Sequence, residues 1–111
     1  VKGVEFGAGF KAAEMKGSEH NDPICDAQGH TATNHAGGIV GGISNGNEIV
    51  VRAAIKPTAS ISMAQQTFNF ESGSIEPLVI KGRHDVCITL RAAVVIEAAT
   101  AIALADLSLR A

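Results

Sequence analysis

Residues 91–110 form a segment that is apolar on nearly every side, which restricts the folds open to this chain. At 3.6 residues per turn, the segment predicts a helix of about five turns. A helix without a wide polar face is usually buried at the centre of a protein or at a subunit interface. Its apolar stretch contains Glu97 and Asp106, so it is too short and too interrupted to span a bilayer. The segment therefore predicts a packed protein neighbour.

Short apolar or alternating runs before this helix predict β-strands. The expected strands are residues 2–6, 39–44, 48–55, 61–70 and 76–80, with a break at Ser72-Gly73 between the last two. Asn45-Gly46 predicts a hairpin turn between the second and third strands, because both residues accept positive φ. Residues 10–16 predict a short helix that Gly17 closes. The fold class is therefore α+β, with antiparallel β hairpins or a sheet packed on helices, in a single domain over residues 1–111.

Composition excludes several classes of partner. The chain is 46% hydrophobic and 18% charged, which argues against disorder. A net charge of −2 gives no electrostatic attraction to nucleic acid or to an anionic membrane. With no Trp, no Tyr and four Phe, a stacking platform for bases is not expected. We therefore expect neither a nucleic-acid nor a membrane partner.

Two cysteines and the first residues bear on cellular location. Cys25 and Cys87 stand far apart and form no C-x-x-C pair. They could form one disulfide, but in a chain rich in Ala, Val and Ile we expect them to be reduced and buried. No basic region followed by an apolar run opens the sequence, so we expect no signal peptide and a cytoplasmic location. Val1 opens a strand-like run without an initiator Met, so we expect the chain to begin within a longer protein.

Two glycine-rich segments resemble nucleotide-binding loops. Residues 7–12 follow a strand and match the pattern G-x-G-x-x-A. A dinucleotide fold also needs a second parallel strand with an acidic residue about 20 residues on. The chain instead enters a polar loop at Ser18, so a tight strand-to-helix turn is the favoured interpretation. Residues 37–42 lack the Lys-Ser/Thr pair of a P-loop, and their glycines fit a structural turn and a ligand cradle equally well.

The polar loop over residues 18–38 contains four potential metal ligands: His20, Cys25, His30 and His35. No C-x₂-C or H-x₃-H spacing occurs among them, so we expect scattered loop histidines and no metal site. Long loops without secondary structure are uncommon in compact domains unless they carry function. We therefore interpret this loop as a candidate lid or partner-facing segment.

Two polar motifs at predicted strand ends are the main site candidates. The first consists of Lys56, Pro57, Thr58, Ala59 and Ser60. Its cation and hydroxyls suit a phosphate or a polar heterocycle, although alone it reads as an ordinary strand-ending turn. The second motif, residues 81–85, places four ionisable side chains in five residues. Such a cluster is unfavourable near a core unless it is paired or binds a ligand, which favours a site.

The order of several motifs resembles the chorismate synthase family. The motifs are Gly-Ser-Glu-His-Asn-Asp at 17–22, the glycine-rich string at 33–46, Lys-Pro-Thr-Ala-Ser at 56–60, Gly-Arg-His-Asp-Val-Cys at 82–87, and Arg91-Ala92 before the alanine-rich helix. They cover nearly the whole chain, but only about the C-terminal third of the family's usual length. The resemblance implies part of the family's β-α-β sandwich.

The resemblance also implies a carbon–oxygen lyase of aromatic amino acid biosynthesis. The family uses reduced FMN in a 1,4-elimination of phosphate from 5-enolpyruvylshikimate 3-phosphate, which gives chorismate. Carried over by position, the FMN contacts would be Gly41, Lys56, Pro57, Thr58, Ala59, Ser60 and Arg83. Arg83 would also lie toward the anionic substrate, and Asp85 would be the catalytic residue that helps to move the flavin proton. The family's tetramers imply a homo-oligomer, with residues 96–107 as a contact.

The chain departs from the family at Val86, where Pro is usual, and at Ala93-Val94, where Val-Pro is usual. The second change affects the start of the last helix. The family's two catalytic histidines and its arginine cluster belong to an N-terminal part that this chain lacks. We therefore expect no turnover from the isolated chain.

Two other functions stay open. One is a non-catalytic binding or assembly module that keeps the chorismate synthase scaffold and uses the apolar helix as an interface. The other is a small dinucleotide-binding domain, which rests only on residues 7–12.

Overall fold

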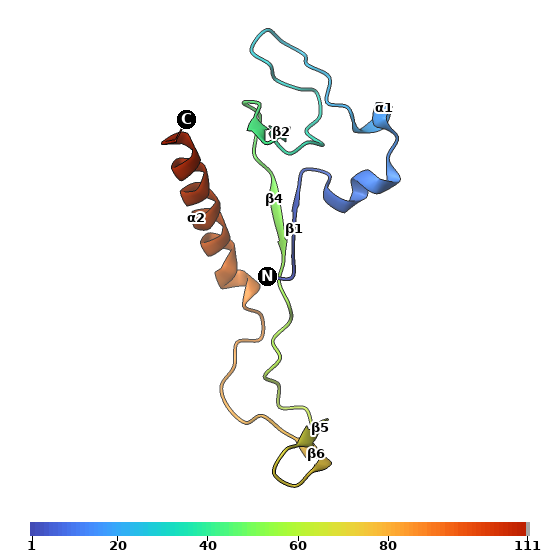
Figure 1. Ribbon diagram of the computed structural model, residues 1–111, viewed down its shortest axis with the longest axis vertical. Coiled ribbons are helices and arrows are strands. Elements are labelled where there is room, and N and C mark those ends of the chain that lie inside the picture. The colour runs from blue at the N-terminus through green and yellow to red at the C-terminus, as the bar shows by residue number, and fades with distance from the viewer. Residues whose placement is uncertain (111) are drawn as a thin grey trace. The chain divides into compact units, whose positions relative to one another are not determined.

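The structure is a computed structural model that describes residues 1–110. These residues divide into two compact units, Val1–Ile55 and the part from Lys56 onward, and each is described by itself. Antiparallel strand pairs and helices both occur, with five strands in succession between the short helices and α2 (Figure 1), which is consistent with the α+β class. The strands form three separate pairs rather than one sheet, so the sandwich is not confirmed. The interpretation of residues 1–111 as a single domain stays a prediction.

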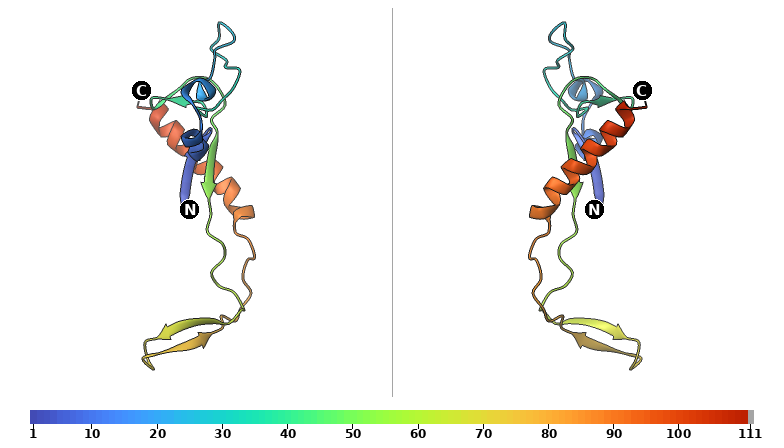
Figure 2. Two further views of the ribbon diagram at one scale, coloured as in Figure 1. Left: turned by 90° about the vertical axis from the view of Figure 1, so that its right-hand side faces the viewer. Right: turned by 90° about the vertical axis from the view of Figure 1, so that its left-hand side faces the viewer.

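An antiparallel pair joins the two ends of the first unit. Strand β1 (Gly3–Phe6) pairs with β4 (Val51–Ala54), and the two lie side by side in Figure 1 and Figure 2. Glu5 stands opposite Arg52, and the Arg52 Nε donates a hydrogen bond of 2.7 Å to the Glu5 carboxylate. The predicted strands at 2–6 and 48–55 are confirmed, but the partner of the second is β1.

The predicted hairpin turn at Asn45-Gly46 is wrong. Strands β2 (Ile39–Val40) and β3 (Ile43–Ser44) pair with each other, and Gly41-Gly42 forms the turn between them. Both glycines have positive φ, 59° and 80°, as a two-residue hairpin turn of this kind requires. The Asn45 side chain instead accepts the N–H of Asn47, which turns the chain toward β4. Residues 39–44 are thus a small hairpin and not one strand.

Three glycines are the only buried residues among residues 1–110: Gly7, Gly37 and Gly38. All three have positive φ. A Cβ on Gly37 would lie 2.7 Å from the Cα of Gly7, and a Cβ on Gly38 would lie 2.5 Å from the carbonyl oxygen of Glu48. The Gly7 N–H donates to Val50 O at 3.0 Å in the same contact. Backbone therefore packs directly on backbone here, which only glycine permits.

The segment after β1 differs from the predicted α-helix over residues 10–16. It is a 3₁₀ helix, η1 (Gly9–Glu14), and Met15 is already extended. Gly17 does not close it but begins a one-turn helix, α1 (Gly17–His20). The Glu5 side chain accepts the N–H of Phe10 at 3.0 Å and so holds the start of η1 against β1.

Asp22 organises the polar loop between α1 and β2. Its carboxylate accepts the backbone N–H groups of His35 and Ala36, both at 2.8 Å, and the Thr33 hydroxyl at 2.7 Å. Burial opposes ionisation of Asp22, but these bonds and the nearby His35 outweigh it and hold the pKa of Asp22 below its ordinary value. The loop stability that Asp22 contributes is therefore present above the ordinary aspartate pKa and is lost as pH falls through the lower folded value.

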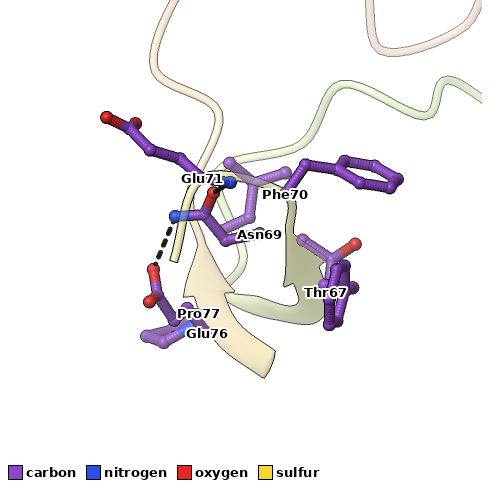
Figure 3. Close-up of a pocket in the computed structure, with 8 residues that line it drawn as sticks. Thr67, Asn69, Phe70, Glu71, Glu76 and Pro77 are labelled. Atoms are coloured by element: carbon purple, nitrogen blue, oxygen red, sulfur yellow. Dashed lines mark hydrogen bonds between the residues drawn. The ribbon is translucent and has the colours of Figure 1, made fainter. Parts of the chain in front are cut away.

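The second unit contains a hairpin of β5 (Gln65–Asn69) and β6 (Ser74–Leu78). Their turn includes Ser72-Gly73, as predicted, with Gly73 at positive φ. Asn69 accepts the N–H of Glu71 and donates to the Glu76 carboxylate, each at 2.9 Å (Figure 3). The two predicted strands are confirmed over part of their lengths.

Helix α2 (Thr89–Ser108) confirms that the chain ends in a long helix, which runs without a break through Ala93-Val94. None of its side chains is buried, and Leu90 and Ile102 are 85% and 70% exposed. Burial of this helix is therefore not confirmed. Among residues 1–110, no helix combines the length and apolar character needed to cross a membrane.

The described residues bury no hydrophobic side chain, so they form no apolar core. Cys25 and Cys87 are both free thiols, but both are exposed, and the expectation of burial is wrong for each. The apolar pattern that predicts burial is present in the sequence. Among residues 1–110, no neighbouring surface covers these side chains fully.

We expect the isolated 111-residue chain to lack a cooperative thermal unfolding transition and to bind the dye ANS. Burial of apolar surface is the main driving force of folding, and residues 1–110 bury no apolar side chain. Differential scanning calorimetry and ANS fluorescence provide the measurement. A single sharp calorimetric transition without dye binding would contradict this expectation.

Candidate functional site

A hollow of about 320 Å³ lies in the second unit, between the segment that follows residue 56 and the segment that precedes α2. Its lining consists of Pro57, Thr58, Ser60, Ile61, Ser62, Gly82, His84, Asp85 and Val86. The two motifs predicted to share a site are therefore neighbours in space. Ile61 and Ser62, which sequence reasoning did not single out, extend the same wall.

Thr58 ties the two segments together. Its hydroxyl donates to the carbonyl oxygen of Asp85 at 2.8 Å, with a longer approach of 3.4 Å to that of Val86. Thr58 and Asp85 are 27 residues apart in sequence. Because the hydroxyl proton is already engaged, Thr58 can only accept a hydrogen bond from a ligand.

Gly82 gives the second segment a conformation that other residues avoid. Its φ is 152°, and a Cβ at this position would lie 2.9 Å from the His84 Nε2. Glycine therefore lets the chain fold the His84 ring back beside it. This local turn places His84 and Asp85 together in the lining.

Asp85 also forms an ion pair with the first turn of α2. The Asp85 Oδ2 lies 3.2 Å from the Arg91 Nη1, and both side chains are at least partly exposed. Sequence reasoning noted Arg91 as part of a motif but gave it no place at the site. The sequence contained one sign of this ion pair. A cation in the first turn of a helix is disfavoured by the helix dipole, so a nearby anion stabilises it.

The start of α2 also favours negative charge at Cys87. The Thr89 hydroxyl, followed by the backbone N–H groups of Thr89 and Leu90, lowers the pKa of the Cys87 thiol below its ordinary value. The hydrogen-bond donors at this helix start thus support an anion.

Not every predicted site residue lines the hollow. Lys56, Ala59 and Arg83 are exposed and are not among its lining residues, although each is a chain neighbour of one that is. Gly41 belongs to the first unit, where it forms the turn between β2 and β3. The space beside Gly41 is open, so its role as a turn leaves its backbone accessible to a ligand.

A larger hollow of about 550 Å³ lies on the β5–β6 hairpin (Figure 3). It is the open face of a two-stranded ribbon, and its polar side chains already bond to one another. The bonds from Asn69, Ser72 and Ser74 lower the pKa of the Glu76 carboxyl. Ligand sites need convergent polar groups that are free to bind. The smaller hollow at Thr58 and Asp85 is therefore the better candidate.

The dinucleotide interpretation of residues 7–12 loses support. The Glu5 carboxylate accepts the N–H of Phe10, where a bound phosphate would have to lie. The N–H of Phe10, and then the side chain of Arg52, lower the pKa of Glu5, so the charge there is negative. The strand that pairs with β1 is antiparallel, whereas the dinucleotide fold needs a parallel one.

Two of the three loop histidines have carboxylate partners. His30 pairs with Asp26 at 2.5 Å, and His35 pairs with Asp22 at 3.2 Å. Within the described range 1–110, no group of three His, Cys, Asp or Glu side chains is placed to hold a metal ion. His30 and His35 thus each have a local structural partner.

Comparison with known proteins gives a consistent result. The family model described as chorismate synthase matches residues 1–109. The chain is 62% identical over 109 residues to the chorismate synthase of Chitinophaga pinensis, which covers 98% of this chain and 33% of that protein. It is 58% identical over 108 residues to the chorismate synthase of Archaeoglobus fulgidus, which covers 96% of this chain and 30% of that protein.

The chain spans about a third of the length of the relatives that it matches. The match nevertheless covers both motifs that line the hollow and the helix that follows them. On the strength of the family match and these identities, the chain belongs to the chorismate synthase family.

Proposed function

We propose that this chain supplies the C-terminal part of the reduced-FMN site of a chorismate synthase. The complete enzyme would convert 5-enolpyruvylshikimate 3-phosphate into chorismate by elimination of phosphate and a ring hydrogen. The observation that carries this proposal is the Thr58–Asp85 hydrogen bond, which joins the two family motifs around one hollow. The motifs are far apart in sequence, so their meeting is a property of the fold.

The chemistry of the residues present fits an anionic flavin. The hollow, at about 320 Å³, is near the lower end of the usual size of ligand sites, as expected for part of a site. Ser60 offers a hydroxyl group in its wall and Thr58 an acceptor oxygen for a flavin N–H, and the cations Lys56 and Arg83 adjoin the wall in sequence. Guanidinium and ammonium groups near such a wall attract phosphate. When bound, reduced FMN would supply the electron density that helps to expel phosphate from the substrate.

Asp85 is the residue to which we assign a chemical role. Asp85 lines the hollow and pairs with Arg91, and a carboxylate in this place can accept a proton at an oxygen atom. Arg83 would lie toward the anionic substrate. We also propose that Gly41 contacts the flavin through its backbone, with the open side of the Gly41-Gly42 turn as the approach.

The exposed apolar side chains of α2 favour assembly. Ile102 and Leu107 are 70% and 63% exposed, which is unusual for a finished surface. We propose that residues 96–107 contact other protein in a cytoplasmic homo-oligomer, with a small-molecule substrate and neither nucleic acid nor membrane as a partner. The same exposure is what a non-catalytic assembly module on this scaffold would show, so activity must decide between the two functions.

A hybrid enzyme tests the proposed function. In the hybrid, this chain replaces the matching 109 residues of the Chitinophaga pinensis chorismate synthase. We expect chorismate formation from 5-enolpyruvylshikimate 3-phosphate with reduced FMN under anaerobic conditions, because the motifs would meet their missing half. The isolated chain should give no turnover. A soluble, folded hybrid without activity would support the non-catalytic module. Turnover by the isolated chain would contradict the proposal that it supplies only part of the site.

Arg83→Ala in the hybrid should weaken binding of reduced FMN. Hydrogen bonds to charged groups contribute about 1.5–3 kcal/mol, so the dissociation constant should rise roughly tenfold or more. Anaerobic flavin titration gives this value. Arg110→Ala, which removes an exposed arginine that pairs with Asp106 at the far end of α2, is the control and should bind flavin normally. Equal affinities for the two variants would remove Arg83 from the site.

Thr58→Val should loosen the hollow while keeping the shape of the side chain. Loss of one hydrogen bond costs about 1 kcal/mol net, so we expect flavin affinity in the hybrid to fall about fivefold. Thr58→Ser keeps the hydroxyl that reaches the Asp85 carbonyl and should retain the affinity. If serine weakens binding and valine does not, packing by the methyl group and not the hydrogen bond is what matters at Thr58.

A further inference from the structure

Asp85 is restrained from two directions in the second unit. Thr58 donates to its backbone carbonyl at 2.8 Å, which fixes the position of the main chain. The Arg91 Nη1 lies 3.2 Å from its carboxylate Oδ2, which restricts rotation of the side chain. The first restraint belongs to a motif already assigned to the flavin site. The second comes from a residue with no assigned role.

The position of Arg91 in α2 points to a role outside the helix. It is the third residue of a helix of 20 residues, where the positive end of the helix dipole disfavours a cation. Arg110, near the other end, pairs with Asp106 one turn earlier, in the arrangement that the dipole favours. Of these two arginines, only Arg91 pairs with a residue that precedes the helix. Its charge therefore opposes the local preference of the helix and compensates Asp85.

Arg91 is the cation beside the Asp85 carboxylate, with its Nη1 3.2 Å from Oδ2. A carboxylate that is free to rotate samples many orientations in the hollow. One that pairs with Arg91 favours the orientation in which the ion pair forms.

We propose that Arg91 is a positioning residue that orients the Asp85 carboxylate for proton transfer. This inference rests on the proposed function, in which Asp85 helps to move a proton. The other ionisable group in the lining is His84. Lys56 and Arg83 form no ion pair with Asp85 in the described structure, so Arg91 is the cation that acts on its carboxylate.

The test uses the hybrid enzyme with 5-enolpyruvylshikimate 3-phosphate and reduced FMN. Misplacement of a catalytic group by about 1 Å can reduce the rate by up to roughly a hundredfold. For Arg91→Ala we expect kcat to fall about tenfold, with KM and flavin affinity little changed, because Arg91 touches Asp85 and not the ligands. The pair is a single contact, so a point charge can replace the guanidinium, and Arg91→Lys should restore kcat to within about threefold.

Two further variants separate the positioning role from general effects on the helix. Arg110→Ala removes a comparable exposed ion pair from the same helix and should leave kcat unchanged. Asp85→Asn should lower kcat, and adding Arg91→Ala to it should cause little further loss, since the two residues act as one unit. If Arg91→Ala is insoluble, Arg91→Gln keeps hydrogen-bond donors without charge and takes its place in every comparison.

The outcomes are distinct. If Asp85→Asn lowers kcat but Arg91→Ala behaves like Arg110→Ala, the inference is wrong and the proposed function stands. If Arg91→Ala lowers kcat equally with and without Asp85→Asn, Arg91 acts by another route and the inference is also wrong. If Asp85→Asn leaves kcat unchanged, the proposed role of Asp85 fails first, and the role of Arg91 fails with it.

Discussion

The first unit depends on a contact between backbones, in which Gly7 meets Gly37 while Gly38 meets the carbonyl of Glu48. No larger side chain fits at these positions, since a Cβ would overlap main-chain atoms. The contact brings the end of β1, the end of the polar loop and the start of β4 together. Asp22 then orders the loop through three hydrogen bonds, and the small β2–β3 hairpin projects beyond it. Local polar geometry, and not an apolar core, defines this unit.

Patterns that depend on neighbouring residues predict much of this fold. The apolar segment that becomes α2 and the Ser72-Gly73 turn between β5 and β6 are both found where the sequence places them. The hairpin at residues 39–44 was missed because two dipeptides compete. Both Gly41-Gly42 and Asn45-Gly46 can form the required turn. Because β4 pairs with β1, which is far away in sequence, β3 pairs with β2 and the turn lies at Gly41-Gly42. The 3₁₀ form of η1 likewise depends on Glu5, whose side chain returns from the preceding strand.

For the candidate site, the sequence predicts the motifs that line it but not the contacts between them. The motifs at 56–60 and 81–85 end predicted strands, and the hollow between them is lined by Pro57, Thr58, Ser60 and Asp85 from the predicted set. The tether from Thr58 could not be foreseen, because its acceptor is a carbonyl group and every residue has one. The ion pair of Asp85 with Arg91 required knowing where α2 begins. Burial is not confirmed for α2 and is wrong for both cysteines, because an apolar pattern marks side chains that could be buried but does not say which surface covers them.

The pairing of β1 with β4 has a consequence for the order in which the chain folds. Glu5 and Arg52 are 47 residues apart, so this pair closes a long loop before any contact within it is rewarded. The β5–β6 hairpin needs only a short turn and can form within about 1–10 μs. We therefore expect the β5–β6 hairpin to form before the β1–β4 ladder, whose pairing closes the longer loop.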